Sequence, residues 1–463
     1  MKENHLCRTI ACDEGVGQVG TGRNGMKEKR LGRRVSEPVS FVPLIKTLCW
    51  ACFGIWLMSL IVGTFQPPAN SSPIDFFSYT NAAEALSQGK SPYPSLEEAH
   101  SIWLFYHKID QDISNARISG QWDTVRHELT DKPPRPGTYM YPPTLARLIL
   151  FTDISQKAFA CLLILAILGF SLLWIRESGA HPLFLVLVPG SYEIYNALHS
   201  GNVELLLLFL TLLAAVLLWH QKAYWAAPVI AFIVLVKPFY AIFFLTFGML
   251  YGISGSMPKG LLRRWALPGL LTVALVLLEV LSWGPVLRAD SVHYMLHLSD
   301  YLWLAFSPGD QTPMSRWNRT PLQAFVSAGV PLNMANLWVM AIWAVLLGLT
   351  LWKAKGRDVG FARTFALAFI LLYWARPVGW GLVYLEFVLL STLWPDLTPW
   401  RRLALCAALG LLMASRKWAF ILPQGLGMPT QQGPAHPWEA WLALPGSWVL
   451  LWWSLRARPK VMP

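Results

Sequence analysis

Charged residues are scarce in this chain. They make up 14% of its 463 residues, and 54% of the residues are hydrophobic, whereas soluble domains carry roughly 25% charged residues. Apolar runs of about 20 residues, the length that crosses a bilayer, recur along most of the sequence, beginning with the uncharged run 47–65. Because a soluble protein could not bury so much apolar surface, the composition predicts an all-α polytopic membrane protein.

Cysteines are missing from the segments that the sequence places outside the membrane. All six lie in the N-terminal tail or in apolar segments, so disulfides are not expected. Cys49 and Cys52 form a C-x-x-C within the first apolar run. No second ligand pair follows, which favours small packing residues over a redox pair or a zinc site.

The familiar motifs of nucleotide and metal chemistry give little support for such sites. The sequence contains no Walker loop, and G-x-G-x-x-G occurs only within residues 15–25 of the polar N-terminal tail rather than in a strand–turn–helix unit, so neither ATP-driven transport nor a Rossmann domain for nucleotide sugars is indicated. H-x-x-x-H spacing occurs once, at His293 and His297, and D-x-D spacing once, at Asp110 and Asp112. Neither pair by itself argues for a bound metal, and no metal or other cofactor is expected. The lack of a convincing internal repeat counts mildly against a transporter built from duplicated halves.

Basic residues are concentrated where they predict topology. The formal net charge is +12, and a basic run precedes the first apolar segment. Such a run is typical of nucleic-acid binding, but beside a membrane helix it indicates a cytoplasmic segment next to anionic lipid. Residues 1–40 are predicted to be a disordered cytoplasmic tail, followed by an uncleaved anchor helix.

Lys and Arg recur after every second apolar segment, as the positive-inside rule requires. This pattern predicts a body over 41–455 with outer loops 66–140 and 285–330, a cytoplasmic C-terminal tail at 456–463, and both termini in the cytoplasm. Half-helices around Lys237 and Arg376 would change the number of spans by two. About twelve spans are predicted, at 47–65, 158–174, 181–196, 201–219, 223–236, 239–251, 265–283, 331–352, 361–375, 378–394, 403–414 and 438–455.

The first outer loop contains the best candidate for a catalytic acid or base. Asp75 precedes an aromatic and Ala/Leu-rich stretch that predicts a short interfacial helix ended by Gly89 and Pro92. A helix cap and a catalyst explain Asp75 equally well. Tyr139, Tyr141 and Pro142 end the loop in Y-M-Y-P-P, which interfacial aromatic residues and a helix start also explain.

Two cations occupy breaks between apolar segments. Lys237 lies in V-L-V-K-P-F-Y and Arg376 in W-A-R-P-V-G-W, each followed by proline. Charges in such surroundings are costly and indicate a functional site, with snorkelling to the interface as the alternative. Facing one cavity, the two cations would bind a phosphate group. A polar cluster around one outer turn is also predicted to line a cavity; it comprises Tyr192, Glu193, Asn196, His199, Asn202 and Glu204.

Taken in order, these motifs resemble glycosyltransferase family 87 over about residues 73–386. The motifs are D-F-F-S-Y with A-A-E-A-L, G-K-S-P-Y, Y-M-Y-P-P, H-S-G-N-V-E, L-V-K-P-F-Y and R-P-V-G-W. The resemblance implies a C-superfamily (GT-C-like) transmembrane bundle with interfacial helices in the first outer loop. Departures from the family pattern are Asn202 for the usual Gln, Glu204 for Asn, Arg376 for Ser, and no His shortly after Trp380.

The same resemblance implies an activity. A sugar, mannose first among the candidates, would pass from a polyprenyl-phosphate carrier to a hydroxyl of a glycan or glycolipid, with inversion, outside a bacterial cytoplasmic membrane. Asp75 would be the general base. Lys237, Arg376 and His199 would hold the donor phosphate, and the substrate cavity would be lined by Tyr79, Tyr139, Tyr141, Pro142, Asn202 and Trp380. The expected partners are these substrates and the bilayer, with no nucleic acid. A flippase for a lipid-linked sugar and a non-catalytic scaffold are the alternatives.

Overall fold

The computed structural model is helical throughout the residues that it describes, with no strand among them. The chain divides into two units, Met1–Pro43 and Leu44–Pro463, and the elements below belong to the second. The predicted tail 1–40, the span 403–414 and the C-terminal residues 456–463 lie outside the description. The described residues are 42–65, 74–93, 95, 97, 141–189, 191–254, 261–296, 320–376, 383–396, 398, 400 and 437–455.

Among the described residues, four helices are long and apolar enough to cross a membrane, which confirms the membrane-helix character of the chain. A fifth span results if the bent pair formed by α7 (Tyr192–Ser200) and α8 (Glu204–Trp219) counts as one. The lipid bilayer is therefore the environment of this protein. The four helices are α1 (Val42–Phe65), α6 (Gln156–Ser178), α11 (Leu261–Ser282) and α16 (Leu332–Ala354).

In the described part of the chain, four apolar helices are too short to cross by themselves, and the shortest is α5 (Pro143–Thr152). The other three are α9 (Ala223–Val236), α10 (Tyr240–Ile253) and α17 (Phe361–Ala375), and the bounds of α9 and α17 agree with the predicted segments. At about 1.5 Å per residue each of these three is roughly 21 to 23 Å long, against a hydrocarbon core of about 30 Å. Their lengths are compatible with the half-helices considered around Lys237 and Arg376.

The predicted span 181–196 is wrong as a continuous helix. It consists of a 3-10 helix, η1 (Pro182–Leu187), followed by α7, and α7 is bent by 115° from α8. Pro189 lies between η1 and α7, where its missing N–H and fixed φ oppose a continuous helix. The segment predicted at 378–394 also contains a shorter helix, α18 (Leu385–Leu393), continued by the 3-10 turn η2 (Trp394–Asp396).

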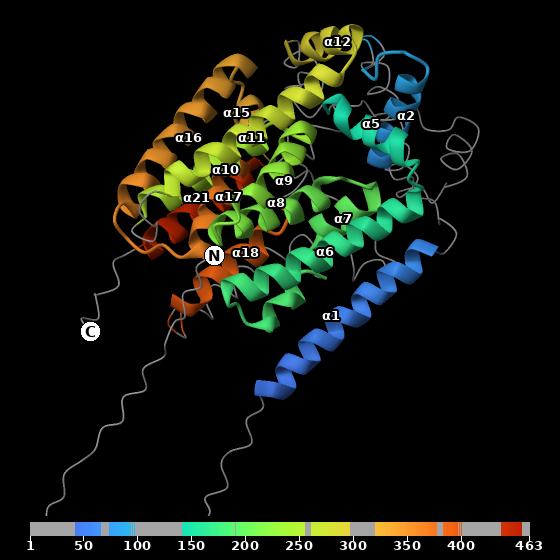
Figure 1. Ribbon diagram of the computed structural model, residues 1–463. Helices are drawn as coiled ribbons and strands as arrows, with labels where there is room; N and C mark the ends of the chain where they lie inside the picture. The colour runs from blue at the N-terminus through green and yellow to red at the C-terminus, as the bar shows by residue number, and fades with distance from the viewer. Residues whose placement is uncertain are drawn as a thin grey trace, which may run out of the picture. The chain divides into compact units, whose positions relative to one another are not determined.

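The first outer loop contains the predicted short helix. Helix α2 (Ile74–Ser87) has Asp75 in its first turn and is followed by Gly89 at φ +69°, a left-handed conformation that suits glycine. Helix α5 (Pro143–Thr152) starts at the second proline of Y-M-Y-P-P, as predicted, and packs against α2 (Figure 1).

The second outer loop contributes α12 (Pro285–Leu296) and α15 (Pro321–Ser327). Helix α12 directly follows α11 and shares one end of the molecule with α2 and α5 (Figure 1). The Tyr93 ring stacks on Tyr294 of α12 with centroids 4.4 Å apart, and the Tyr93 hydroxyl donates to the carbonyl of Tyr141 at 3.3 Å. The two outer loops therefore meet beside the start of α5.

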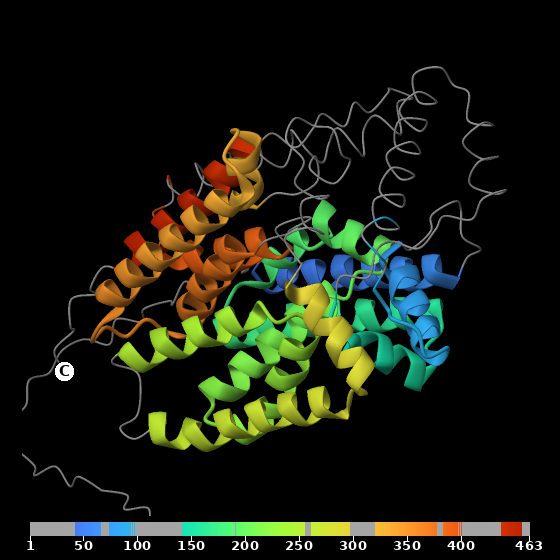
Figure 2. The same cartoon turned by 90° about the horizontal axis from the view of Figure 1, so that it is seen from above.

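Packing around α8 and α17 forms the core. Helix α9 contacts both α8 and α11, and α6 covers α8. On the other side, α17 packs against α10, α16, α18 and α21 (Pro437–Ser454), and α16 and α21 run alongside each other in Figure 2. Deep in this core the Trp174 indole donates to the Ser391 hydroxyl at 2.7 Å.

The helix ends that are predicted to face the cytoplasm gather together. The Trp219 ring, at the end of α8, lies 4.5 Å from the ring of Tyr251 near the end of α10 and 5.6 Å from that of Phe361 at the start of α17. His220 lies 2.8 Å from Glu177 near the end of α6. The opposite ends of α8, α9 and α17 also meet, and there they bring the polar residues of the membrane body together.

Candidate functional site

A buried carboxylate joins the two membrane cations. Glu204 Oε2 accepts a hydrogen bond from Lys237 Nζ at 2.5 Å, and Glu204 Oε1 lies 2.9 Å from Arg376 Nη1. The Tyr240 hydroxyl donates to the same Oε1 at 2.6 Å. Glu204, Lys237 and Arg376 are 3%, 8% and 4% exposed, so all three charges lie inside the protein.

The ends of three helices position this cluster. Glu204 occupies the first turn of α8, where the helix dipole favours a carboxylate. Lys237 follows α9 in extended backbone before Pro238, and Arg376 follows α17. Each charge therefore sits at a helix end rather than within a continuous span, and the opposite charges offset the desolvation cost of burial.

Aromatic rings surround the cations. Lys237 Nζ lies 5.0 Å from the ring centroid of Tyr141, and the Arg376 guanidinium carbon lies 5.2 Å from the Phe239 ring and 5.0 Å from the Tyr373 ring. Such ring faces attract cations, more strongly where water is displaced. Tyr141 thus brings the end of the first outer loop against Lys237.

Asp75 lies beside the cluster. Its half-buried carboxylate is hydrogen-bonded to Ser200 and Asn202 and interacts electrostatically with the charge of Lys237. Burial raises the pKa of Asp75 above its ordinary 3.8, although the hydrogen bonds and Lys237 act in the opposite direction. Asn202 Oδ1 also accepts from the Glu204 backbone N–H at 2.9 Å, so one side chain connects Asp75 with the start of α8.

Tyr79 and Tyr141 hold α2 against the turn between α7 and α8. The buried Tyr79 hydroxyl accepts from the Val203 backbone N–H at 3.3 Å and donates to the Tyr141 hydroxyl at 3.4 Å. Their rings meet edge to face, with centroids 5.3 Å apart. Tyr79 is one turn after Asp75, so the same contacts position the carboxylate.

The structure brings six predicted site residues together: Asp75, Tyr79, Tyr141, Asn202, Lys237 and Arg376. His199 is placed differently, because its side chain is exposed and stacks on Tyr195 with centroids 5.5 Å apart. Pro142 is half-buried just before α5. Tyr139 and Trp380 lie outside the described residues.

Sequence reasoning missed the partners of the predicted residues. Glu204 was expected only to line a cavity, and neither Tyr240 nor Ser200 was singled out. A signal was available for Glu204, since two cations buried in apolar surroundings require a nearby carboxylate. Nothing in the sequence distinguishes Tyr240 or Ser200 from other polar residues near helix ends.

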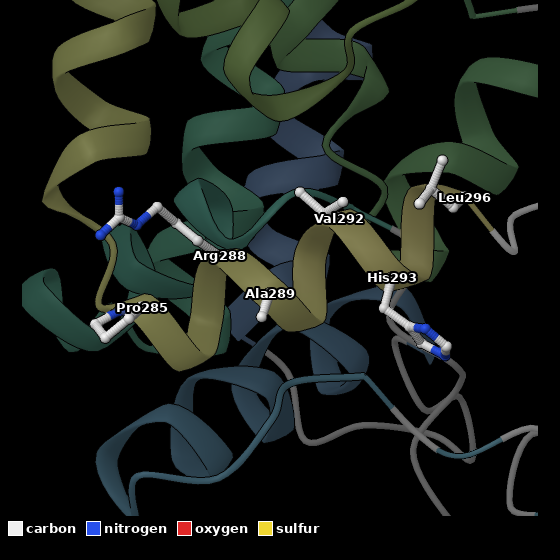
Figure 3. A pocket seen from close by; sticks show the side chains of 6 residues that line it. All are labelled: Pro285, Arg288, Ala289, Val292, His293 and Leu296. Atoms are coloured by element: carbon white, nitrogen blue, oxygen red, sulfur yellow. The ribbon is translucent and has the colours of Figure 1, made fainter.

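Within the described parts of the chain, no three His, Cys, Asp or Glu side chains form a group that could hold a metal ion. A hollow on the surface lies elsewhere, along α12, where Figure 3 shows the six lining side chains. They all come from that one helix and include Arg288 and His293.

Chemically, the site around Asp75 can accept a proton and bind an anion.

Comparison with known proteins found no match to this chain among family models, curated proteins or solved structures.

Proposed function

We propose that this protein is a membrane glycosyltransferase that moves a sugar from a polyprenyl-phosphate carrier to a hydroxyl of a glycan or glycolipid. The observation that carries the proposal is the position of Asp75, a half-buried carboxylate beside the Lys237–Glu204–Arg376 cluster. A base next to an anion site is what an inverting displacement of a phosphate leaving group requires.

Asp75 is the general base in this mechanism. The acceptor hydroxyl loses its proton to the Asp75 carboxylate while its oxygen attacks the anomeric carbon. Hydrogen bonds from Ser200 and Asn202 orient the carboxylate. Partial burial raises its pKa, which makes it a stronger base than an exposed aspartate.

Lys237 and Arg376 stabilise the charge that develops on the departing polyprenyl phosphate. Both are preorganised, because Glu204 and the surrounding rings hold them at the ends of α9 and α17. Preorganised charges in a site that excludes water contribute more than the same charges in bulk solvent.

The proposal also covers the fold and the membrane topology. We propose a GT-C-like bundle of about twelve spans in a bacterial cytoplasmic membrane, with both termini in the cytoplasm and the site facing outward. Support comes from the segregation of helix ends. Predicted inner ends meet at Trp219, and predicted outer ends meet at Glu204. An outward site would be reached by extracytoplasmic acceptors and by lipid-linked donors at the membrane boundary.

A flippase for a lipid-linked sugar is the second candidate. The 115° bend between α7 and α8 and the break between α9 and α10 favour it, since transporter sites are often formed by discontinuous helices. A flippase needs the cations but gives no role to the proton-accepting Asp75.

Sugar transfer by the purified full chain, supplied with labelled polyprenyl-phosphate sugars and host lipid extract, tests the proposal. Mannose is the first donor in the panel. Wild type is compared with Asp75→Asn and with Glu84→Gln, a control that removes an exposed carboxylate from the same helix α2. We expect transfer by wild type and by Glu84→Gln, and its loss in Asp75→Asn. Equal transfer by the Asp75 variant, or none from any donor, would favour the flippase.

A further inference from the structure

The anion site carries one carboxylate for two cations. Both oxygens of Glu204 are engaged, Oε2 by Lys237 and Oε1 by Tyr240 and Arg376. With Lys237 and Arg376 charged and Glu204 ionised, the buried cluster has a net charge of +1. Tyr141, Tyr240 and Tyr373 also face it, as neutral phenols, and Asp75 faces it from α2.

Arg376 retains hydrogen-bonding capacity. Its side chain is 4% exposed, and among the described residues its Nε has no hydrogen-bond partner. A guanidinium presents donors in a planar fork that suits phosphate oxygens. Arg376 can therefore hold Glu204 with one edge and a phosphate oxygen with another, while Lys237 contributes its charge from the side of Tyr141.

We propose that Glu204 is a specificity-determining residue that limits this site to a singly charged phosphate diester and disfavours the doubly charged monoester. The inference rests on the proposed function, in which the donor is a phosphodiester and the product a phosphomonoester. A monoanion neutralises the +1 cluster, whereas a dianion leaves a buried negative charge next to the Glu204 carboxylate.

During the reaction one negative charge moves from Asp75 to the phosphate, next to the Glu204 carboxylate. The acceptor oxygen forms a bond to the anomeric carbon, and the bond from that carbon to the phosphate oxygen breaks with its electron pair on the phosphate. The acceptor proton passes to Asp75. The phosphate thus leaves as a monoester with a second charge, since the second pKa of phosphate esters is about 6. Glu204 then weakens the retention of the product and promotes its release.

Binding measurements with two lipids test this role without requiring sugar transfer. The probes are farnesyl phosphate, a monoester, and its methyl ester, a diester, titrated at pH 8 into the detergent-solubilised full chain. Glu204→Gln raises the cluster to +2, so we expect the affinity for the monoester relative to the diester to rise at least about tenfold. Glu279→Gln is the matched control, because Glu279 pairs with Arg147 on α5, outside the cluster.

A second measurement covers the case in which Glu204→Gln does not fold. It uses the Asp75→Asn variant, because this substitution removes the titration of the neighbouring carboxylate. Between pH 5 and pH 8 the monoester gains its second charge, so it should bind roughly tenfold more weakly at pH 8 than at pH 5. Diester binding should not change. Monoester affinity that is constant or rises with pH would overturn the role of Glu204.

The outcomes separate this inference from the proposed function. Sugar transfer by wild type together with an unchanged monoester-to-diester ratio in Glu204→Gln would overturn the role of Glu204 and leave the enzyme in place. A shifted ratio without transfer from any donor would support the charge-limited site and overturn the glycosyltransferase. Failure of wild type to bind either probe would overturn the site itself.

Discussion

Asp75 is a carboxylate in an environment that disfavours its charge. It has a helix N-terminal position and two hydrogen bonds, yet burial dominates and raises the pKa of Asp75. A capping aspartate that served stability alone would have its charge favoured by the fold. The raised pKa of Asp75 therefore favours the functional interpretation over the structural one.

The pH dependence of Asp75→Asn follows from the direction of this shift. Because the folded-state pKa is raised, the contribution of Asp75 to stability is fully present below the unfolded pKa and is lost as pH rises through the folded value. At pH 7 we expect Asp75→Asn to melt at the same temperature as wild type or higher, while transfer falls by about 10² to 10⁴. Wild-type activity should decline on acidification with a midpoint above 3.8.

Thermal melting in detergent and a pH profile of transfer check this prediction, with Glu84→Gln as the control. A clear drop in the melting temperature of Asp75→Asn at pH 7 would return Asp75 to the role of a cap.

Lys237 is stabilised by Glu204, and its removal should be costly. Lys237→Met leaves Glu204 with Arg376 as the one cation of the cluster, and we expect the free energy of unfolding to fall by on the order of 2 kcal/mol or more. Lys222→Met, in the exposed turn between α8 and α9, should change it by less than about 0.5 kcal/mol. Denaturation in mixed detergent micelles measures both. Equal stability of the two variants would mean that the buried ion pair contributes nothing to the fold.

At the scale of elements, close approach of α6 and α8 depends on Gly169. A Cβ at this position would lie 2.6 Å from a ring carbon of Phe209 on α8, a distance at which one side chain must move. Small residues at helix contacts allow such approach in membranes. Helix α8 begins directly after the turn at 201–203, where Asn202 Oδ1 accepts from the Glu204 backbone N–H.

Gly169→Ala should destabilise the protein by roughly 1 to 3 kcal/mol through overpacking. Gly348→Ala on the exposed face of α16 has open space around its Cβ and should be neutral or slightly stabilising, since alanine has the higher helix propensity. Thermal melting of the two variants side by side gives the comparison. A stability for Gly169→Ala equal to that of Gly348→Ala would indicate that Phe209 moves aside without cost.

At the scale of the whole molecule, the ends of the core helices meet in two separate groups. Helix ends that are predicted to face the cytoplasm meet at Trp219, and the buried cluster lies at the opposite ends of α8, α9 and α17. We expect alkaline phosphatase fused after Lys90 to be active outside the cytoplasm, and fusions after Lys222 or Lys355 to be inactive. Green fluorescent protein at the same positions should give the reverse pattern. An active phosphatase after Lys222 would invert the orientation and place Asp75 in the cytoplasm.

The sequence alone determined the membrane class, the bounds of α9 and α17, the start of α5 and the position of Asp75 at the beginning of α2. These features depend on local rules: apolar length, proline at a first helical turn and glycine after a helix end. Local rules failed at 181–196, where apolar composition is compatible with both a crossing helix and the bent arrangement that the structure has.

Only the tertiary structure decided how the charges combine. Lys237 and Arg376 follow different helices, and both reach Glu204 because α8, α9 and α17 end at one place. It also separated His199 from Asn202, which are only three residues apart in the sequence. His199 is exposed, whereas Asn202, at the 115° bend between α7 and α8, is hydrogen-bonded to Asp75. The physical reason is that burial and pairing are properties of packed helices. The length and composition of a segment specify which residues lie in the membrane, but the partner of a buried charge depends on which helix ends meet.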